Sequence, residues 1–282
     1  MIEEKTEVDL NSSELFGDDD FESRIREEAD FGMDEISPEI SAQTLRPPAK
    51  ILEIGCGTGF LLGQLAGEYP EYEFHGLEPI GPGFDDFSDL LEKIIGTSES
   101  IQLIRAGAED FKTEEKFDLI YSVNVFEHLE DWRKGIENCI SHLSEDGRMI
   151  FLCPNYDFPY EPHFSIPIIW DKKLTRRIFR KKIEDYHAPV GNDGPWRSLN
   201  FIKASEVKRH ARTHGYEISF DQAVFGRMLR RLTEQEGFSQ RHGLLATIGK
   251  LAIRLGLAGV FNALPQFLQP YMKVTISKPV RS

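Results

Sequence analysis

Short apolar runs alternate with stretches of helical periodicity along the first half of the chain. The apolar runs have the length of strands, and the stretches between them repeat apolar residues every three or four positions. This alternation is typical of a mostly parallel sheet with helices on both faces. It predicts strands at 49–54, 73–77, 101–105, 117–122 and 148–153, helices at 58–69, 84–95 and 131–143, and a turn at Asp146-Gly147.

The pattern changes after Pro154, where residues 154–200 become rich in proline, aromatic residues and histidine. Further along, a helix is expected over 205–215, because Gly215 suits a helix C-cap. The remaining predicted elements are strands at 216–220 and 272–277 and an apolar helix around 244–263.

Composition narrows the class of protein. The chain has 282 residues, of which 40% are hydrophobic, and this suits one large α/β domain or two small ones. The first 40 residues lack the apolar run of a signal peptide. The three cysteines, Cys56, Cys139 and Cys153, cannot all pair in disulfides, and none has metal-ligand spacing with another. A reducing, cytoplasmic location is the simplest interpretation.

The negative charge is concentrated at the N-terminus. Residues 1–40 hold fifteen acidic and three basic residues, a net −12 within a chain of net −14. One interpretation is a solvated, partly disordered tail. The other is a lid, in which Phe16, Phe21, Ile25 and Phe31 dock over a site while the carboxylates stay in water.

A glycine-rich loop, LEIGCGTG at 52–59, follows the first predicted strand and opens a helix. Glycine lets the backbone turn tightly and approach a ligand, and the N–H groups of a helix start favour an anionic or polar ligand. The G-x-G-x-G spacing, with Phe60 next, departs from the dinucleotide fingerprint. No Lys-Ser/Thr pair follows, so a P-loop is excluded.

Acidic residues follow the next two strands. Glu78 ends the second strand, where a carboxylate accepts hydrogen bonds from ribose hydroxyls. The third strand ends in AGAED at 106–110, which suits an adenine. Such strand ends converge on one crevice. The alternative is an ordinary turn after the first strand, with the acids capping helices.

With these motifs, residues 49–153 resemble the class I S-adenosylmethionine-dependent methyltransferases. The resemblance implies a Rossmann-like, seven-stranded sheet whose last strand is antiparallel. It implies S-adenosyl-L-methionine as cofactor, with Glu53 facing the methionine amino group, Glu78 the ribose, and FDLIYSVNVFEHLED at 117–131 closing over the cofactor. The implied cofactor-binding residues are Glu53, Gly55, Cys56, Gly57, Thr58, Gly59, Glu78, Pro79, Ala108, Glu109, Asp110, Asn124 and Val125.

The resemblance also divides the chain. Residues 1–45 form the acidic N-terminal segment, and residues 46–153 form the cofactor-binding half of the methyltransferase domain. Residues 154–282 form its acceptor-binding and C-terminal half.

The segment after the fourth strand bears on the methyl acceptor. Nitrogen-methylating relatives carry an Asn/Asp-Pro-Pro-aromatic motif there, whereas this chain has SVNVFEH, so we expect an oxygen acceptor. The segment resembles the E-x-x-E-H motif of ubiquinone-biosynthesis O-methyltransferases and small-RNA 2′-O-methyltransferases, which binds a divalent metal. Asn124 replaces the first acid and is a weaker ligand for a hard cation. Glu127, His128 and His163 would be the ligands of a metal; the alternative is that Glu127 and His128 cap a short helix and shape the cofactor floor.

The segment CPNYDFPYEPHFSIPIIW at 153–170 follows the fifth strand, where this superfamily binds acceptors. It resembles bacterial methyltransferases associated with surface-polysaccharide synthesis. Tyr156, Phe158, Tyr160 and Phe164 would stack on a sugar or aromatic ring, and the predicted catalytic residues are His128, Tyr160, Glu161 and His163. The alternative is a loop packed by its own aromatic residues. His187 and residues 191–201 are expected to complete the pocket.

The predicted activity is therefore methylation of a sugar hydroxyl in a glycan or glycan precursor. Three other interpretations stay open: a quinone or other small phenolic acceptor, 2′-O methylation of RNA, and a non-catalytic binding subunit. The acidic chain argues against bulk nucleic-acid binding.

Two segments suggest a peripheral membrane contact. KKLTRRIFRKK at 172–182 has seven basic residues that would meet phosphates or an anionic membrane, unless it is a solvated helix face. The apolar stretch at 244–263 contains Lys250 and Arg254, so it does not predict a membrane span. It would lie at an interface or cover the acceptor site. A lipid- or nucleotide-linked sugar would explain both segments.

Overall fold

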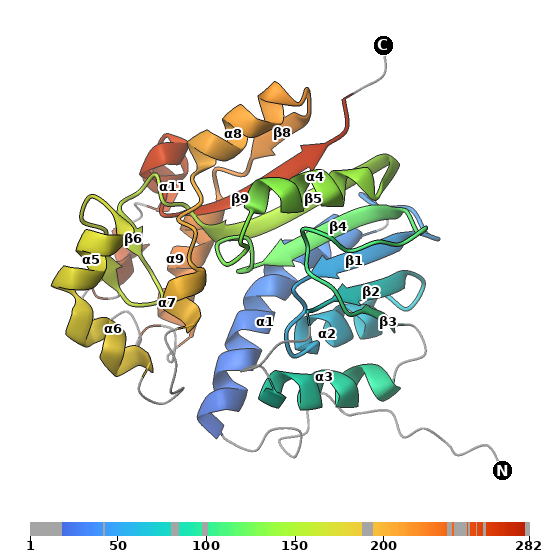
Figure 1. Ribbon diagram of the computed structural model, residues 1–282, viewed down its shortest axis with the longest axis horizontal. Coiled ribbons are helices and arrows are strands. Elements are labelled where there is room, and N and C mark those ends of the chain that lie inside the picture. The colour runs from blue at the N-terminus through green and yellow to red at the C-terminus, as the bar shows by residue number, and fades with distance from the viewer. Residues whose placement is uncertain are drawn as a thin grey trace. The chain divides into compact units, whose positions relative to one another are not determined.

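A seven-stranded sheet organises the structure, a computed structural model that describes residues 19–41, 43–79, 85–97, 101–187, 194–235, 239, 247, 249–251, 253–255 and 258–279. The strand order is β3-β2-β1-β4-β5-β9-β8 (Figure 1). β1 pairs in parallel with β2 and β4, β2 pairs in parallel with β3, and β9 pairs antiparallel with β8. The predicted mostly parallel α/β sheet with an antiparallel last strand is confirmed. The strands are β1 (Lys50–Ile54), β2 (Glu73–Leu77), β3 (Ile101–Ile104), β4 (Phe117–Val123), β5 (Leu143–Pro154), β8 (Glu217–Phe220) and β9 (Tyr271–Ser277).

The chain divides into two compact units. Unit 1 comprises Met1–Val123 and Gly135–Ile150, and unit 2 comprises Asn124–Lys134 and Phe151–Ser282. The predicted cofactor motifs up to Asp110 therefore lie in unit 1, whereas the segment from Asn124 onward and the 153–170 segment lie in unit 2.

The strands of unit 1 are apolar because parallel strands are covered on both faces. Ile51, Leu52 and Ile54 of β1 and Leu119 and Ile120 of β4 are all buried. The helices of unit 1 are α1 (Asp19–Ile40), α2 (Phe60–Glu68), α3 (Asp85–Thr97) and most of α4 (Trp132–Ser141).

Two expectations for unit 1 are wrong. The acidic segment is not a disordered tail over 19–40, where it forms α1, whose Phe31, Ile36 and Ile40 are buried. Apolar burial on one face explains this: α1 lies against α2, and a Cβ at Gly32 would meet Leu61 at 2.4 Å. Residues 1–18, including Phe16, lie outside the described residues.

The turn expected at Asp146-Gly147 is also absent, because both residues lie inside β5. A Cβ at Gly147 would meet the Phe117 carbonyl oxygen at 2.6 Å. The glycine therefore permits close approach of two strands, a tertiary requirement that leaves the same local signal as a turn.

Unit 2 carries a small antiparallel hairpin of β6 (Tyr160–Glu161) and β7 (Ile166–Pro167), in which Glu161 pairs with Ile166. Gly215 has a φ of 72°, which confirms the predicted end of α8. The other elements are α5 (Lys172–Ile178), α6 (Arg180–His187), α7 (Gly194–Ser198), α8 (Ala204–Thr213), α9 (Val224–Glu234), α11 (Ala258–Asn262) and η2 (Gln266–Leu268).

The apolar helix expected around 244–263 falls largely on residues outside the described part of the chain. Among the described residues, none of the helices has both the length and the apolar character that crossing a membrane requires.

Candidate functional site

The glycine loop of unit 1 has the backbone that its sequence predicts. Gly55, Gly57 and Gly59 have φ angles of 69°, 52° and 74°, a left-handed conformation that favours glycine. The Gly55 and Cys56 amides donate to the Leu77 carbonyl oxygen and so tie the loop to the end of β2. A Cβ at Gly57 would meet nothing within 4 Å, so the loop leaves open space at the position expected to face a ligand.

Two carboxylates of unit 1 lie at the ends of neighbouring strands. Glu78 Oε2 accepts a hydrogen bond of 2.8 Å from the Gly57 amide, which joins the predicted ribose-binding acid to the loop. Burial raises the pKa of Glu78, although the Gly57 amide and Arg105 oppose this. Glu53 is only 4% exposed, and burial raises its pKa to about 8, against the opposing hydrogen bond that Tyr121 donates to it at 3.0 Å.

The other predicted cofactor residues of unit 1 frame the same strand ends. Ala108 is buried, and Asn138 of α4 donates hydrogen bonds to the carbonyl oxygens of Ala108 and Phe111, which holds the turn after β3. The Cys56 and Thr58 side chains are buried, and burial raises the pKa of the Cys56 thiol. Pro79 and Asp110 are exposed, whereas Glu109 is half-buried.

In unit 2, Asn124 begins a turn directly after β4, with a φ of 57°. Its amide donates to the Leu152 carbonyl oxygen at 2.8 Å, and its side-chain oxygen accepts a 2.5 Å hydrogen bond from the Tyr271 hydroxyl. The Asn124 side chain is thereby held by β9. This gives a physical role to the residue that replaces the acid of the E-x-x-E-H motif.

The helix-capping interpretation of Glu127 and His128 is wrong. Residues 126–128 form a turn, in which the His128 amide donates to the Val125 carbonyl oxygen. The first turn of α4 is capped instead by Asp131, whose carboxylate accepts from the amides of Arg133 and Lys134. Glu127 and His128 therefore have no part in starting the helix.

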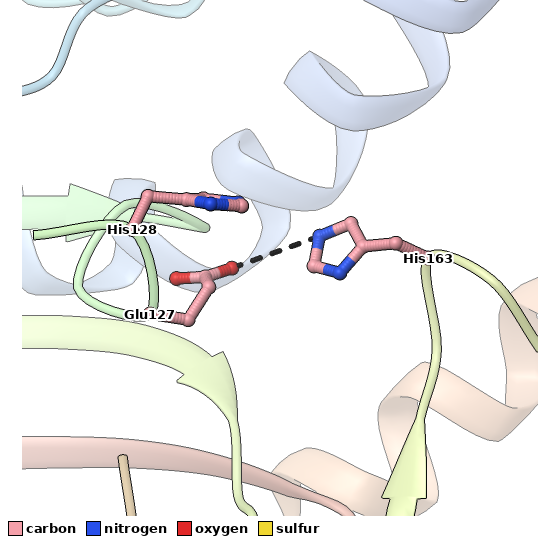
Figure 2. Close-up of side chains that lie close together, drawn as sticks. All are labelled: Glu127, His128 and His163. Carbon is pink, nitrogen blue, oxygen red and sulfur yellow. Dashed lines mark ion pairs between the residues drawn. The ribbon is translucent and has the colours of Figure 1, made fainter. Parts of the chain in front are cut away.

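Glu127, His128, Glu161 and His163 form one group in unit 2, here called the carboxylate–histidine cluster. Both carboxylic side chains are fully buried. His163 Nδ1 lies 2.6 Å from Glu161 Oε1, and His163 Nε2 lies 3.9 Å from Glu127 Oε1. Figure 2 shows the Glu127 carboxylate and both imidazoles converging, with the Glu127–His163 ion pair dashed. The turn after β6 thus brings His163 to the segment after β4.

Hydrogen bonds define which ring nitrogens face the centre of the cluster. The Ser198 hydroxyl donates to the Pro195 carbonyl oxygen, so its oxygen accepts from His128 Nδ1 at 2.8 Å. The Glu161 carboxylate accepts from His163 Nδ1. In the neutral rings, both Nε2 atoms then carry lone pairs. Burial, with His163 and Lys172 nearby, lowers the pKa of His128 to about 3, so that ring is neutral.

The cluster is suited to holding a proton or a cation. Glu127, His128 and His163 each present one ligand atom within 4.8 Å of the others. In the neutral form these atoms are all acceptors, one on the buried Glu127 and two on half-buried imidazoles, and a shared proton or a positive ion would stabilise them together. Imidazoles whose Nδ1 is bound by a carboxylate or hydroxyl are the usual form of histidine metal ligands. The side chains present therefore fit a divalent metal.

The aromatic residues of the 153–170 segment divide into two groups. Tyr156 and Phe164 are buried and pack on other aromatic rings, Tyr156 on Phe201 and Phe164 on Trp196, so they do not present a face to an acceptor. For these two, the packed-loop alternative is correct. Phe158 and Tyr160 remain half-buried, and burial raises the pKa of Tyr160.

The 191–201 segment contributes residues that sequence reasoning had not singled out. Ser198 is one, and Asn200 is another. The Asn200 side-chain amide donates to the carbonyl oxygens of Phe126 and Leu129, and its backbone amide donates to the carbonyl oxygen of Glu127. Asn200 therefore holds the turn that carries Glu127 and His128. Neither contact had a signal in sequence spacing, because about seventy residues separate the partners. The side chain of His187 and residues 188–193 lie outside the described part.

Comparison with known proteins identifies the family. Residues 23–219 match the methyltransferase domain family. The chain belongs to this family. It is 35% identical over 254 residues to the uncharacterized protein Rv1509 of Mycobacterium tuberculosis, covering 89% of this chain and 85% of that protein. It is 25% identical over 231 residues to a malonyl-[acyl-carrier protein] O-methyltransferase of Bacillus cereus, covering 74% and 82%.

Among solved structures, the plantazolicin methyltransferase BamL, in complex with a substrate analogue and S-adenosylhomocysteine (SAH), has a TM-score of 0.54 at 15% identity. The match covers 92% of this chain and 88% of BamL. The predicted Rossmann-like class I methyltransferase fold is confirmed, and so is S-adenosylmethionine as the cofactor of the family to which this methyltransferase belongs.

Proposed function

We propose that this methyltransferase transfers a methyl group to a sugar hydroxyl of a glycan or of a lipid- or nucleotide-linked glycan precursor. One observation carries the choice of a hydroxyl oxygen: the buried Glu161 carboxylate holds His163 by its Nδ1, which leaves Nε2 to accept a proton. A hydroxyl must lose its proton as it attacks the methyl carbon, so this acceptor needs such a base.

In the proposed reaction, the acceptor oxygen forms a bond to the methyl carbon as the bond from that carbon to the sulfonium sulfur breaks. The hydroxyl proton passes to His163 Nε2, and SAH remains. Glu161 orients the imidazole and stabilises its positive charge. Because the donor is already activated, the remaining contribution of the protein is alignment of the acceptor.

Unit 1 supplies the donor side of this proposal. Glu53 would pair with the methionine ammonium, since a buried carboxyl with a raised pKa gains from a cation. The Gly55–Gly59 backbone would cradle the methionine end. Glu78, already oriented by the Gly57 amide, would accept from the ribose hydroxyls, and the Ala108 turn would hold the adenine.

On the acceptor side, what supports a sugar is the half-buried pair Phe158 and Tyr160 near His163 in sequence, because aromatic faces stack on the C–H faces of sugars. Tyr160 is the second polar candidate for positioning the hydroxyl, and His128 lines the cluster beside His163, with the two ring centroids 5.3 Å apart.

A divalent ion would be held by Glu127, His128 and His163, and when bound it would lower the pKa of an acceptor hydroxyl. His163 would then serve as a ligand in place of its role as base. Removing metal with EDTA separates the two versions of the mechanism. Full turnover in EDTA is expected if His163 takes the proton, and turnover restored only by added metal would assign the cluster to the ion.

A second candidate is methyl esterification of a carboxylate, favoured by the Bacillus cereus relative, whose name gives it a malonyl acceptor and an O-methyl product. A carboxylate is already ionised at neutral pH and needs no base. The two candidates therefore differ in their dependence on His163.

The test measures methyl transfer from labelled S-adenosylmethionine to panels of glycans, nucleotide sugars, lipid-linked sugars, phenols, quinols and acyl acids. His163→Ala should lower kcat for a hydroxyl acceptor by about a hundredfold to ten-thousandfold while SAH affinity stays unchanged. His214→Asn, an exposed histidine outside the cluster, serves as the control. Methylation of acyl acids alone, with kcat unaffected in His163→Ala, would refute the proposal in favour of esterification. Failure to bind SAH would refute both candidates.

A further inference from the structure

Three large apolar side chains before and along α5 of unit 2 are exposed to solvent. Trp170 is 94% exposed, Leu174 39% and Ile178 54%, and they recur at every fourth residue. In α5, Leu174 and Ile178 therefore share one face of the helix. Three large exposed apolar side chains within nine residues, here called the apolar row, are unusual, whereas single ones are ordinary.

Local hydrogen bonds hold this row outward. The Thr175 hydroxyl is buried and bonds the backbone of Ile169 and Asp171, which fixes the inner face of α5. The Asp171 carboxylate caps the helix by accepting from the Leu174 amide. Trp170 has a φ of 63°, a conformation that a bulky residue adopts only when its surroundings impose it. The backbone is thus held so that the largest apolar side chain faces water.

Basic side chains lie beside this row. Lys173, Arg177 and Lys181 are exposed and are also spaced by four residues. They belong to the 172–182 run, which carries seven basic residues in a chain of net charge −14. Positive charge is therefore concentrated where the exposed apolar row is.

We infer that the α5–α6 surface, defined by Trp170, Leu174, Ile178, Lys173, Arg177 and Lys181, docks on an anionic lipid bilayer. Tryptophan favours the interface between acyl chains and headgroups, and lysine and arginine reach back to lipid phosphates while their stems lie along apolar surface. The exposed apolar row suits the lipid interface, and the basic residues beside it suit the anionic headgroups.

The composition of the row favours lipid over nucleic acid. Aromatic rings and cations serve both partners, but Leu174 and Ile178 offer no flat face for stacking on a base. A protein partner would not require the concentration of basic residues. The inference does not depend on the proposed acceptor. If both are correct, the surface would deliver the enzyme to an acceptor linked to lipid.

Two further exposed apolar residues of unit 2 also have basic neighbours in the chain. Leu251 and Leu255 are 56% and 65% exposed, and the Leu255 amide donates to the Leu251 carbonyl oxygen, which places them one helical turn apart. Lys250 and Arg254 precede them in the chain. The rest of the 244–263 stretch lies partly outside the described residues, so the inference rests on the α5–α6 surface.

The chain contains its own probe for the test. Of its three tryptophans, Trp132 and Trp196 are 3% and 1% exposed, so Trp170 alone should respond to a change of solvent. The full-length protein is titrated with vesicles of phosphatidylcholine, with and without phosphatidylglycerol. Tryptophan emission should shift to shorter wavelength, and the protein should sediment, only with the anionic vesicles. Salt should reverse both effects.

Three variants and one control sharpen the result. Trp170→Phe should sediment with the vesicles but lose the spectral shift. Leu174→Ser with Ile178→Ser, and separately Lys173→Glu with Arg177→Glu, should each lower the partition coefficient by about tenfold or more. Phe267→Ser, which removes another exposed apolar side chain of unit 2, should bind as the wild type does.

Absence of both sedimentation and spectral shift with anionic vesicles would overturn the inference. So would binding that the Leu174/Ile178 variant retains in full. A single-stranded oligonucleotide that binds through Trp170 when vesicles do not would assign the surface to nucleic acid. Self-association that depends on the same residues, in the absence of vesicle binding, would assign it to a second copy of the chain.

Discussion

In unit 1, the glycines expected to hold the cofactor lie within five consecutive positions of one loop, which hydrogen bonds to Leu77 and Glu78 tie to the end of β2. In unit 2, the carboxylate–histidine cluster draws Glu127 and His128 from one turn and Glu161 and His163 from a hairpin, and Ser198 of a short helix hydrogen-bonds His128. A local motif is set by backbone conformation, so sequence patterns describe it well. A long-range cluster is set by side chains that meet only after folding. The sequence proposed Glu127, His128, Glu161 and His163 as candidates, but it gave no signal for the hydrogen bonds that orient the two imidazoles.

The buried carboxyl groups of the two units also have different surroundings. Glu53 of unit 1 has a pKa raised to about 8, so it holds a proton at neutral pH. In unit 2, Glu161 is also fully buried but is bonded to an imidazole instead. A buried carboxyl avoids an isolated charge in either way, and only the second leaves a base ready to act.

The largest effect is expected from a substitution in the glycine loop of unit 1. Gly57→Arg should weaken SAH binding by more than about a hundredfold, or about 2.7 kcal/mol, because the residue has a positive φ and its side chain would enter the open space of the loop. Isothermal titration with SAH measures this. Gly67→Arg is the control. A Cβ at Gly67 likewise meets nothing within 4 Å, but this residue has no positive φ, so the variant should bind SAH normally. Undiminished affinity in Gly57→Arg would contradict the loop assignment.

The next effect tests the long-range cluster. Glu161→Gln should lower kcat by about tenfold to a hundredfold, because the amide still accepts from His163 Nδ1 but no longer stabilises the imidazolium. Both KM and SAH affinity should stay close to wild type, and Glu217→Gln, on the exposed end of β8, should change nothing. A loss confined to thermal stability, with kcat intact, would make Glu161 merely structural.

A smaller effect is expected from the buried carboxyl group of Glu53, which is protonated at neutral pH. Because the folded-state pKa of Glu53 lies above its ordinary value of 4.5, the proton on Glu53 must leave when the methionine ammonium of SAH pairs with it. SAH binding near neutral pH should therefore release about one proton, and affinity should rise with pH up to about 8.

The measurement is isothermal titration in buffers that differ in ionisation enthalpy. Glu53→Gln cannot release this proton, so its observed binding enthalpy should be independent of the buffer. A wild-type enthalpy that is equally independent would show that Glu53 does not meet the ammonium group.

The smallest expected effect concerns the residue that sequence reasoning overlooked. Ser198→Ala removes the acceptor of His128 Nδ1 and frees that ring to adopt either tautomer, which should lower kcat a few-fold, by about 1 kcal/mol. Steady-state kinetics measures it, with Ser141→Ala as control, since Ser141 Oγ bonds Asn138 and the adjacent His142 at the end of α4, away from the cluster in the chain. A loss as large as that of Glu161→Gln would give His128 a direct part in the reaction.

Individual residues show where predictions from the sequence were correct and where they were wrong. Gly55, Gly57 and Gly59 were expected to let the backbone turn tightly and have positive φ angles, and Gly215 ends α8 as expected. Asp146-Gly147 carried the same kind of signal and proved to be inside β5. The acidic charge of residues 19–40 outweighed their apolar spacing in the prediction, although buried Ile36 and Ile40 make that stretch a packed helix.

The sequence alone indicated the family, a mostly parallel sheet with an antiparallel last strand, the glycine loop and the acids at the strand ends, because these follow from local conformation and from periodic burial. Only the tertiary structure decided that Asn124 is held by Tyr271, that Tyr156 and Phe164 are core residues, and that His163 meets Glu127. Such contacts join residues that are far apart in the chain. Their energies depend on burial and hydrogen-bond geometry, which exist only once the chain is folded.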